Sequence, residues 1–491
     1  MSVKEKVYKR IERDHDANLS QIKISDFLRY PSISQTGEGM DEIVEYLKEW
    51  LIRLGCSKVE AVKPDYYWPI VYGEYSAGAE KTLIVYGMYD VQPVDDGWTI
   101  PPFEARIEER EPFGRVYHAR GCMNTKGPMA TAFNAVEAIQ AVGELPVNLI
   151  FVLEGEEEMG SRSMPGFVEK HQGRLRRADA VWFPICSQDQ NGMARPLLGS
   201  EGLLYIELET SGARWGRGPR EFGIHGGYKR FVDSPAWRHV KAIGTLVEDD
   251  GNRIAVEGWY DGIAVPSDED RRIIEEGYRS SVPALDVFDP ELYKRFYKFD
   301  HYVDDMTDPK DIFYALNFGT SINLDGIWGG YTGPGTKTFL PHKVTSKHNI
   351  RFVPNQRSED LQQKIRSHLA KRGYPDVEMR FLGGYSWGVG KYRSPAAEAM
   401  YDMYEEFGVP YSISPPIGAF QLTSPAWPAY VFLDPPLRLP IVGGGLGHGA
   451  LAHTPQEYYV VDGYDGKHAR VHGVREVEKS NVSFLYHFAE R

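Results

Sequence analysis

The stretch Val147–Ser161, with the sequence VNLIFVLEGEEEMGS, joins a run of apolar residues directly to a cluster of four carboxylates. Its apolar part has the length and composition of a buried β-strand. Two other short apolar runs, Thr82–Tyr86 and Ala180–Ile185, have the same character. The three runs predict parallel strands, whose carboxyl ends meet at one edge of a sheet.

Helical patterns accompany these strands. Apolar residues recur at helical spacing over Met40–Leu54 and stop at Gly55, and the Ala-rich stretch Gly127–Val142 favours a second helix. Strands that alternate with helices are typical of a doubly wound, mostly parallel α/β sheet, which binds ligands beyond the carboxyl ends of its strands. The segments expected to form the site are Met88–Asp90, Glu154–Glu158 and Cys186–Asp189.

The middle of the chain has a different pattern. Leu203–Glu209 and Asn349–Pro354 alternate apolar and polar residues, as strands with one exposed face do. Helix-like and loop segments lie between them. We therefore predict a catalytic domain interrupted by an inserted α+β domain. The catalytic domain comprises residues 1–203 and 385–491, and the inserted domain comprises residues 204–384.

Composition narrows the classes of function. The 491 residues are 42% hydrophobic and 25% charged, which is an ordinary globular balance. Asp and Glu (69) outnumber Lys and Arg (56), giving a net charge of −13 that disfavours nucleic acids and anionic membranes. The charged start of the chain does not resemble a secretion signal, and three widely spaced cysteines do not suggest a disulfide framework. We expect a cytoplasmic protein that acts on a small molecule.

The acidic run Glu154–Glu158 is the strongest candidate for chemistry. A solvated turn is the ordinary explanation for such a run, but its position after a buried strand favours acid–base work or cation binding. One carboxylate could bind a metal while its neighbour takes a proton from water. Asp90 ends another strand, where it would otherwise cap a turn, and His453 lies in a loop where a lone histidine is more often structural. The patterns alone indicate a carboxylate and histidine site.

These motifs resemble those of the dinuclear zinc metallopeptidases that include carnosinase-type dipeptidases, aminoacylase, acetylornithine deacetylase and carboxypeptidase G. The resemblance covers most of the chain. It implies the predicted fold, with the inserted domain acting as a lid that mediates homodimerisation. The segments that carry it are Pro31–Ser34, Gly87–Pro93, Arg120–Gly127, Glu154–Ser161, Gly326–Pro341, Arg351–Pro354 and His453–Glu457.

The resemblance also implies roles for four residues. Glu157 falls on the family's general base and Glu158 on a metal-binding carboxylate. His453 falls on a metal-binding imidazole. Asp90 falls on the aspartate that orients a histidine ligand.

The departures from the family pattern are equally specific. Met88 stands where the family has its first histidine ligand, and Asn124 stands where it has the carboxylate that bridges both metals. The remaining terminal aspartate falls near Cys186 or Ser187, with Asp189 as a displaced alternative. The site is therefore expected to have lost ligands for at least one metal position.

Two substrate-contacting positions also differ. The lid histidine that reaches a neighbouring subunit's site appears as Glu221, and the loop that grips a substrate carboxylate begins at Gly418. We expect the substrate to contact Met88, Glu221, Cys186 and Gly418.

Charge counting then limits the metal content. The family site supplies three carboxylates to two dications, whereas Glu158 is the only certain one here. An amide oxygen is a poor bridge, and a thioether is a weak ligand for zinc. We predict at most one divalent metal, zinc by preference. Glu158, His453 and the Cys186 thiolate could hold it, with water as the fourth ligand, and a metal-free pocket is the favoured alternative.

The sequence thus predicts a hydrolase of an amide-like C–N bond in a small molecule, with a degenerate metal site. Glu157 would activate water, while Asp90 and Asn124 would orient their neighbours. One alternative is a catalytically inactive homologue that acts as a binding or structural protein. Another is a metal-independent lyase or hydrolase, for which Cys122 and Cys186 are candidate nucleophiles unless they are small buried hydrophobes.

Overall fold

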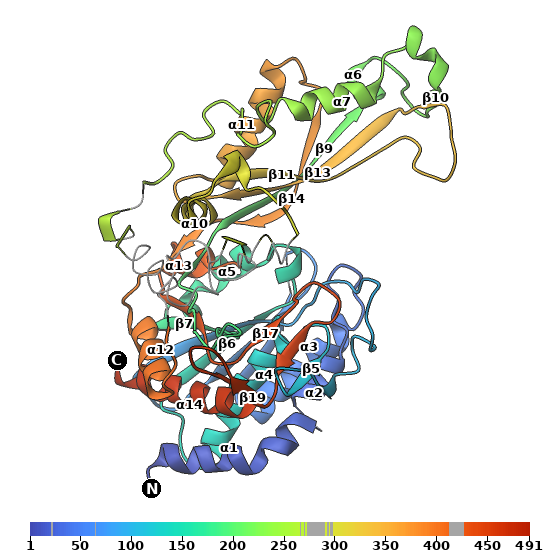
Figure 1. Ribbon diagram of the computed structural model, residues 1–491. Helices are drawn as coiled ribbons and strands as arrows, with labels where there is room; N and C mark the ends of the chain where they lie inside the picture. The colour runs from blue at the N-terminus through green and yellow to red at the C-terminus, as the bar shows by residue number, and fades with distance from the viewer. Residues whose placement is uncertain are drawn as a thin grey trace. The chain divides into compact units, whose positions relative to one another are not determined.

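The chain forms two compact units in a computed structural model (Figure 1). Unit 1 comprises Met1–Ser200, Asp268–Phe296 and Gly388–Arg491, and unit 2 comprises Glu201–Ser267 and Tyr297–Trp387. Both chain termini therefore belong to unit 1. The residues that the structure describes are 1–20, 23–63, 65–265, 267–269, 271–272, 290–291, 294, 298–411 and 427–491.

Unit 1 is built on a six-stranded sheet with the strand order β1-β2-β6-β3-β7-β16. Strands β6, β3, β7 and β16 run parallel, whereas β2 is antiparallel to both of its neighbours. The predicted α/β fold with a mostly parallel sheet is therefore confirmed, and β2 makes the sheet mixed. The strands are β1 (Lys58–Val62), β2 (Ile70–Tyr75), β3 (Thr82–Met88), β6 (Asn148–Glu154), β7 (Ala180–Pro184) and β16 (Ile441–Gly444).

Helices cover both faces of this sheet, because alternate residues of each buried strand point to opposite sides. Leu83 and Val85 of β3 join one apolar cluster, and Ile84, Tyr86 and Met88 join the other. The first cluster includes residues of α1 (Val3–Ser20), α2 (Ile24–Arg29), α3 (Met40–Arg53), α4 (Lys126–Gln140), α12 (Pro395–Glu406) and α14 (Val474–Glu490). The second includes residues of α5 (Met164–Leu175) and α13 (Tyr430–Leu433). No helix of the described residues is both long and apolar enough to cross a membrane.

Smaller sheets complete unit 1. One of them, ordered β17-β18-β5-β4, pairs segments far apart in the chain. Because Tyr458 lies opposite His118 in this sheet, the loop that contains His453 is held near the segment that leads into α4. The strands are β4 (Arg106–Glu109), β5 (Arg115–His118), β8 (Gly199–Ser200), β15 (Gly388–Val389), β17 (Gly449–Ala450), β18 (Tyr458–Val460), β19 (Gly463–Asp465) and β20 (Arg470–His472).

Unit 2 is an α+β unit around an antiparallel sheet ordered β11-β13-β9-β14. Residues of α7 and α11 pack against the sheet in one apolar core. The predicted inserted α+β domain is thus present. The strands are β9 (Gly202–Ser211), β10 (Ile224–His225), β11 (Ser321–Trp328), β12 (Phe339–Leu340), β13 (Lys343–Phe352) and β14 (Glu378–Tyr385). The helices are α6 (Gly212–Trp215), η2 (Gly226–Arg230), α7 (Pro235–Gly244), η3 (Val303–Asp305), α10 (Pro309–Phe318) and α11 (Ser358–Lys371).

Glu478 is a carboxylate buried between three helices of unit 1. It lies on α14 and accepts hydrogen bonds from Asn134 Nδ2 of α4 at 2.6 Å and from Asn18 Nδ2 of α1 at 3.2 Å. Burial raises the pKa of Glu478 to about 7, although the hydrogen bonds from the two amides oppose the shift. Ionised Glu478 therefore destabilises the folded chain, because its charge is poorly solvated.

We predict that Glu478→Gln flattens the pH dependence of stability. The folded protein binds more protons than the unfolded chain between about pH 4.5 and pH 7, so the free energy of unfolding falls as pH rises through this window. The shift corresponds to about 3 kcal/mol at pH 8, which the variant should recover in large part. Denaturant unfolding between pH 4 and 8 measures the effect. The same substitution at exposed Glu490 of α14 should leave the slope unchanged, and an equal slope in wild type and Glu478→Gln would contradict the prediction.

Candidate functional site

The carboxyl ends of β3 and β6 lie side by side in unit 1. Met88 is paired with Glu154 in the parallel register, and the Tyr89 N–H donates to the Glu154 carbonyl at 2.9 Å. Asp90 lies two residues after the end of β3, and the short helix η1 (Glu157–Met159) follows β6. Two of the three predicted site segments therefore meet at one edge of the sheet.

Asp90 fixes the backbone of both central glutamates. Its fully buried carboxylate accepts the N–H of Glu157 at 3.1 Å and the N–H of Glu158 at 3.0 Å. Burial raises the pKa of Asp90 to about 7, and the negative charge of Glu158 adds to the rise, while hydrogen bonds from Ser34 and the two amides oppose it. Asp90 thus holds the first two residues of η1 and sets where the Glu157 and Glu158 side chains begin.

Glu158 is the centre of a polar group that we call the Glu158 cluster, which consists of Gln92, Asn124, Glu158 and His453. Its Oε2 accepts from Gln92 Nε2 at 2.8 Å, and its Oε1 accepts from Asn124 Nδ2 at 3.0 Å. His453 Nε2 lies 3.0 Å from the same Oε1 and 3.0 Å from Asn124 Nδ2. The Glu158 side chain is only 3% exposed, so these neighbours replace most of its contact with water.

His453 reaches Glu158 from the loop between β17 and β18. Its backbone φ of 63° lies in the left-handed region, which costs a residue other than glycine about 1–3 kcal/mol unless its surroundings hold it there. Partial desolvation lowers the pKa of this imidazole, but the charge of Glu158 and the hydrogen bond to it prevail, so the pKa is raised. The side chain is 52% exposed and can meet a ligand.

Glu457 fixes the loop that carries Asn124. Its buried carboxylate accepts the N–H groups of Gly121, Met123 and Asn124, each at 3.0 Å. Arg120 Nη1 lies 3.2 Å away and completes a buried ion pair. Burial raises the pKa of Glu457, and these donors oppose the rise. The loop before α4 therefore takes its shape from a side chain four residues after His453.

We predict that Glu457→Gln destabilises unit 1 by about 3–5 kcal/mol, because it leaves the buried Arg120 guanidinium without its counter-ion. The midpoint of urea unfolding measures the loss. Glu104→Gln is the matched control, because Glu104 forms an exposed ion pair with Arg106 at 2.8 Å and should change stability by no more than about 0.5 kcal/mol. Equal midpoints for the two variants would show that Glu457 does not hold the loop.

Two carboxylates of the acidic run serve the fold. Glu154 accepts from the Tyr86 hydroxyl at 2.5 Å and is buried. Glu156 accepts the N–H groups of Tyr67 at 2.7 Å and Trp68 at 2.8 Å, which ties η1 to the segment before β2. Glu157 and Glu158 are therefore the two members of the run that Asp90 holds at the candidate site.

The third predicted segment, after β7, does not join the Glu158 cluster. Cys186 packs in the apolar cluster that contains α4 and α14, where burial and the charge of Glu457 raise the pKa of its thiol. The Ser187 hydroxyl bonds the Tyr404 hydroxyl at 2.8 Å, and Asp189 Oδ1 accepts the N–H of Asn191 at 2.8 Å. These side chains turn toward the core and local turns.

The predicted metal set of Glu158, His453 and Cys186 is therefore wrong. Within the described ranges, no group of three or more His, Cys, Asp or Glu side chains could hold a metal ion. The physical reason is the direction of Cys186, whose apolar surroundings disfavour a thiolate. Burial raises the pKa of Cys122 in the same way, so neither thiol is activated as a nucleophile.

The other residues predicted to contact the substrate lie in different environments. Met88 is 2% exposed and packs in the apolar cluster with Tyr86. Glu221 is exposed in a bend of unit 2, and Gly418 lies outside the described residues. Their contact with a substrate stays a prediction.

Sequence reasoning missed the roles of Gln92 and Glu457. Gln92 follows Asp90 by two residues, and Glu457 follows His453 by four, so both lie within motifs that the resemblance already covered. A closer reading of polar residues beside the assigned positions could have flagged them. Only the structure shows that one completes the Glu158 cluster and the other shapes a loop.

A mixed α/β sheet with paired glutamates after one strand, a histidine that reaches them from the β17–β18 loop and an inserted α+β unit are typical of metallopeptidase-type hydrolase folds. The model of the family described as Peptidase family M20/M25/M40 matches residues 84–469. The chain belongs to this family.

Curated relatives and solved structures agree with this assignment. Cys-Gly metallodipeptidase DUG1 of Candida albicans is 32% identical over 308 residues, which are 61% of this chain and 59% of the relative. Beta-Ala-His dipeptidase of Homo sapiens is 30% identical over 308 residues, 61% of this chain and 56% of the relative. These matches therefore span less than two thirds of the relatives' length. The M20 family metallo-carboxypeptidase Sso-CP2 from Sulfolobus solfataricus has a TM-score of 0.82 at 30% identity, with 95% of this chain and 98% of that chain covered. Human carnosine dipeptidase 1 shares the fold, with a TM-score of 0.77 at 22% identity over 99% of this chain and 100% of that chain.

Two of these names, Cys-Gly metallodipeptidase and metallo-carboxypeptidase, imply metal ions, but the Glu158 cluster does not fit a two-metal centre. Two dications in such centres lie about 3.5–4 Å apart. At an effective dielectric constant of 20 they repel by on the order of 20 kcal/mol, so nearby anionic ligands are needed to offset the repulsion. The cluster offers one carboxylate and one imidazole, while Asn124 and Gln92 contribute neutral amides that donate to Glu158.

Proposed function

We propose that this protein hydrolyses an amide-like C–N bond in a small, peptide-type molecule. The observation that supports the proposal is the hold of Asp90 on the backbone of Glu157 and Glu158, together with the contact between the Glu158 carboxylate and His453. Membership of the peptidase family supports hydrolysis as the reaction class. The relatives are named for cleaving Cys-Gly and Beta-Ala-His, so dipeptides are the first substrates to test.

In this proposal Glu157 is the general base. It takes a proton from water as the water oxygen attacks the carbonyl carbon, and it then gives the proton to the departing nitrogen as the C–N bond breaks. His453 donates a hydrogen bond to the oxygen on which negative charge develops, since Glu158 favours the protonated imidazole. Asn124 and Asp90 keep Glu158 and its neighbours in place.

We predict that Glu157→Gln lowers kcat on a cleaved dipeptide by about 10²–10⁴-fold, because Gln cannot accept the proton. Release of free amino acids from a dipeptide panel measures the effect. Glu169→Gln, on the exposed face of α5, should leave kcat unchanged. Turnover that survives in Glu157→Gln would exclude Glu157 as the base. A wild-type protein inactive on the whole panel would instead favour the inactive homologue that binds ligands, or lyase chemistry on other substrates.

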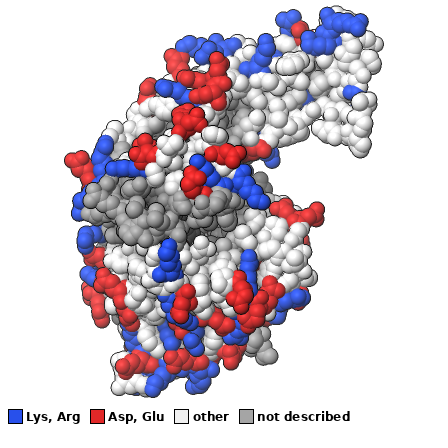
Figure 2. All heavy atoms as spheres, in the orientation of Figure 1, with Lys and Arg blue, Asp and Glu red and all other residues white. Residues whose placement is uncertain are grey.

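We also propose that unit 2 pairs with a second copy of the chain. Large apolar side chains lie exposed on α7 and on the segment that precedes it, including Phe231 (76%) and Trp237 (63%). The surface of unit 2 around β10 and α7 is largely uncharged, with Lys and Arg side chains gathered at its end (Figure 2). Exposed apolar area of this kind marks interaction sites, and a twofold pair is the commonest assembly.

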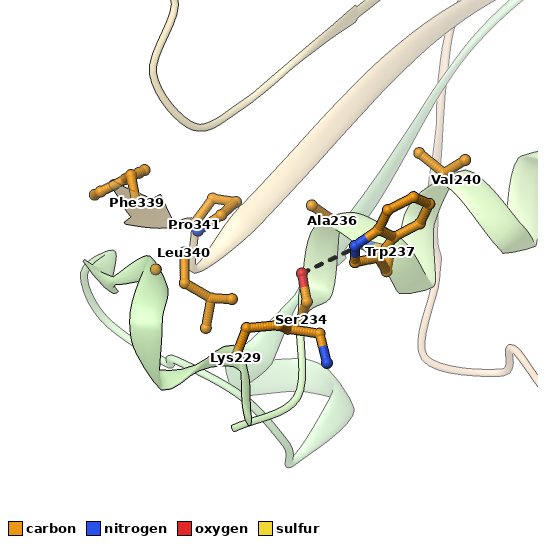
Figure 3. Close-up of a pocket in the computed structure, with 9 residues that line it drawn as sticks. Lys229, Ser234, Ala236, Trp237, Val240, Phe339, Leu340 and Pro341 are labelled. Atoms are coloured by element: carbon orange, nitrogen blue, oxygen red, sulfur yellow. Dashed lines mark hydrogen bonds between the residues drawn. The ribbon is translucent and has the colours of Figure 1, made fainter. Parts of the chain in front are cut away.

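A hollow in this surface supports the proposal. Its volume is about 460 Å³, and Trp237 and Leu340 lie on either side of it (Figure 3). The buried face of α7 packs on the sheet through Ala242, whereas Trp237 and Val240 stay outside. An apolar side chain of a second copy can fill such a hollow and bury the exposed face of α7.

We predict that Trp237→Asp converts a dimer into a monomer. Replacing a central aromatic residue of an interface costs about 2 kcal/mol or more, so the dimer should weaken by at least about 30-fold. Light scattering coupled to gel filtration measures the mass. Val265→Asp, which alters an exposed apolar residue of unit 2 outside this surface, is the control and should remain dimeric. A wild-type monomer, or an unaltered Trp237→Asp dimer, would contradict the prediction.

We place the protein in the cytoplasm. Cys56, Cys122 and Cys186 are all free thiols. Reduced cysteines are typical of the cytoplasm, where thiols are kept reduced.

A further inference from the structure

We infer that the Glu158 cluster stands in the place of a metal centre, so that this protein works without a metal ion at that site. Both oxygens of Glu158 already have partners: Oε1 contacts Asn124 and His453, and Oε2 accepts from Gln92. The carboxylate is almost fully enclosed, at 3% exposure. Hydrogen-bond donors thus stabilise the charge that a cation would otherwise neutralise. This inference goes beyond the proposed reaction and holds whether or not the protein cleaves a dipeptide.

The orientation of the two amides disfavours a metal ion at Glu158. Gln92 and Asn124 point nitrogen atoms at Glu158, and an amide nitrogen donates hydrogen bonds but does not ligate zinc. A metal bound to Glu158 would have to turn both amides and break both hydrogen bonds. The ligands gained in return would be neutral oxygens, which suit zinc less well than a carboxylate or an imidazole.

The side chains at the neighbouring strand ends do not supply a further metal ligand. Met88 at the end of β3 is packed in one apolar cluster, and Cys186 after β7 is packed in the other. Cys186 cannot join Glu158 without leaving its apolar surroundings, and the Met88 thioether is a weak ligand for zinc. Glu158 and His453 therefore have no third ligand of the usual type among the residues that the structure describes.

Asp90 and Glu457 hold the backbone segments that supply the cluster. Asp90 holds the backbone of Glu157 and Glu158, and Glu457 holds the backbone of Asn124. The segments are thus positioned by contacts that do not involve the cluster's own donors. The identity of two side chains, rather than a displaced backbone, excludes the metal, so restoring the ligands should restore metal binding.

The test compares wild type with the double variant Met88→His/Asn124→Asp, using the full chain. Each protein is treated with a chelator to remove metal ions, incubated with excess zinc chloride and dialysed. The zinc bound per chain is then measured by inductively coupled plasma mass spectrometry. We expect no stoichiometric zinc on wild type and at least one ion per chain on the double variant. Zinc should raise the melting temperature of the double variant and leave that of wild type unchanged. Stoichiometric zinc on wild type that disappears in Glu158→Gln would overturn the inference.

Two further variants keep the test decisive. Should the double variant fail to fold, as judged by circular dichroism, Asn124→Asp alone keeps the apolar packing of Met88 and should still gain zinc. Asn252→Asp adds the same charge at an exposed position of unit 2 and should gain none. A folded double variant that binds no more zinc than Asn252→Asp would overturn the assignment of the exclusion to Met88 and Asn124. Because no readout uses turnover, failure of this inference is distinct from failure of the proposed reaction.

Discussion

The hydrogen bonds from the Glu157 and Glu158 amides to the Asp90 carboxylate are the constraint on which the site depends. They join the ends of two adjacent parallel strands and decide where both glutamate side chains begin. Asp90 has no exposed surface, so water cannot replace these contacts without opening the sheet edge. These contacts use backbone N–H groups, so they do not depend on which side chains stand at positions 157 and 158. The side chains at the strand ends can therefore change while the backbone positions stay the same.

Glu457 holds the second half of the site in the same way, through backbone N–H groups. Three backbone N–H groups of the loop before α4 end on its carboxylate, and the same loop supplies Asn124. His453 and Glu457 share one connection between β17 and β18, so the residue that shapes the loop and the residue that contacts Glu158 are positioned by the same segment. The positions of Asn124 and His453 are thus coupled through the fold rather than through a shared ligand.

The sequence was sufficient for the parts of the molecule that depend on local pattern. Apolar runs predicted β3, β6 and β7, and helical spacing predicted α3, because burial imposes those patterns directly. The meeting of Glu158 with His453, 295 residues apart, followed only from resemblance to a family. The metal role of Cys186 was wrong because a position after a strand does not reveal whether the side chain turns to the ligand or into the core. The roles of Gln92 and Glu457 were not predicted, because they arise from contacts between residues far apart in the sequence, which produce no periodic pattern.

The exchange of cations for hydrogen-bond donors has a chemical consequence that favours particular substrates. A metal ion stabilises the charge that develops on a carbonyl oxygen by several kcal/mol, and one well-placed donor contributes about 10²–10³-fold in kcat, or about 3–4 kcal/mol. A single donor therefore stabilises this charge less than the two ions of a dinuclear centre do. In the Glu158 cluster, Asn124 and Gln92 donate to Glu158, and only His453 combines a donor with a half-exposed side chain. A site with this limited polarising power is suited to a carbonyl that is already activated, or to a leaving nitrogen that departs readily. The physical limit therefore lies in the electrophile, and it distinguishes this chain from proteins of the same fold that are named as a metallodipeptidase and a metallo-carboxypeptidase.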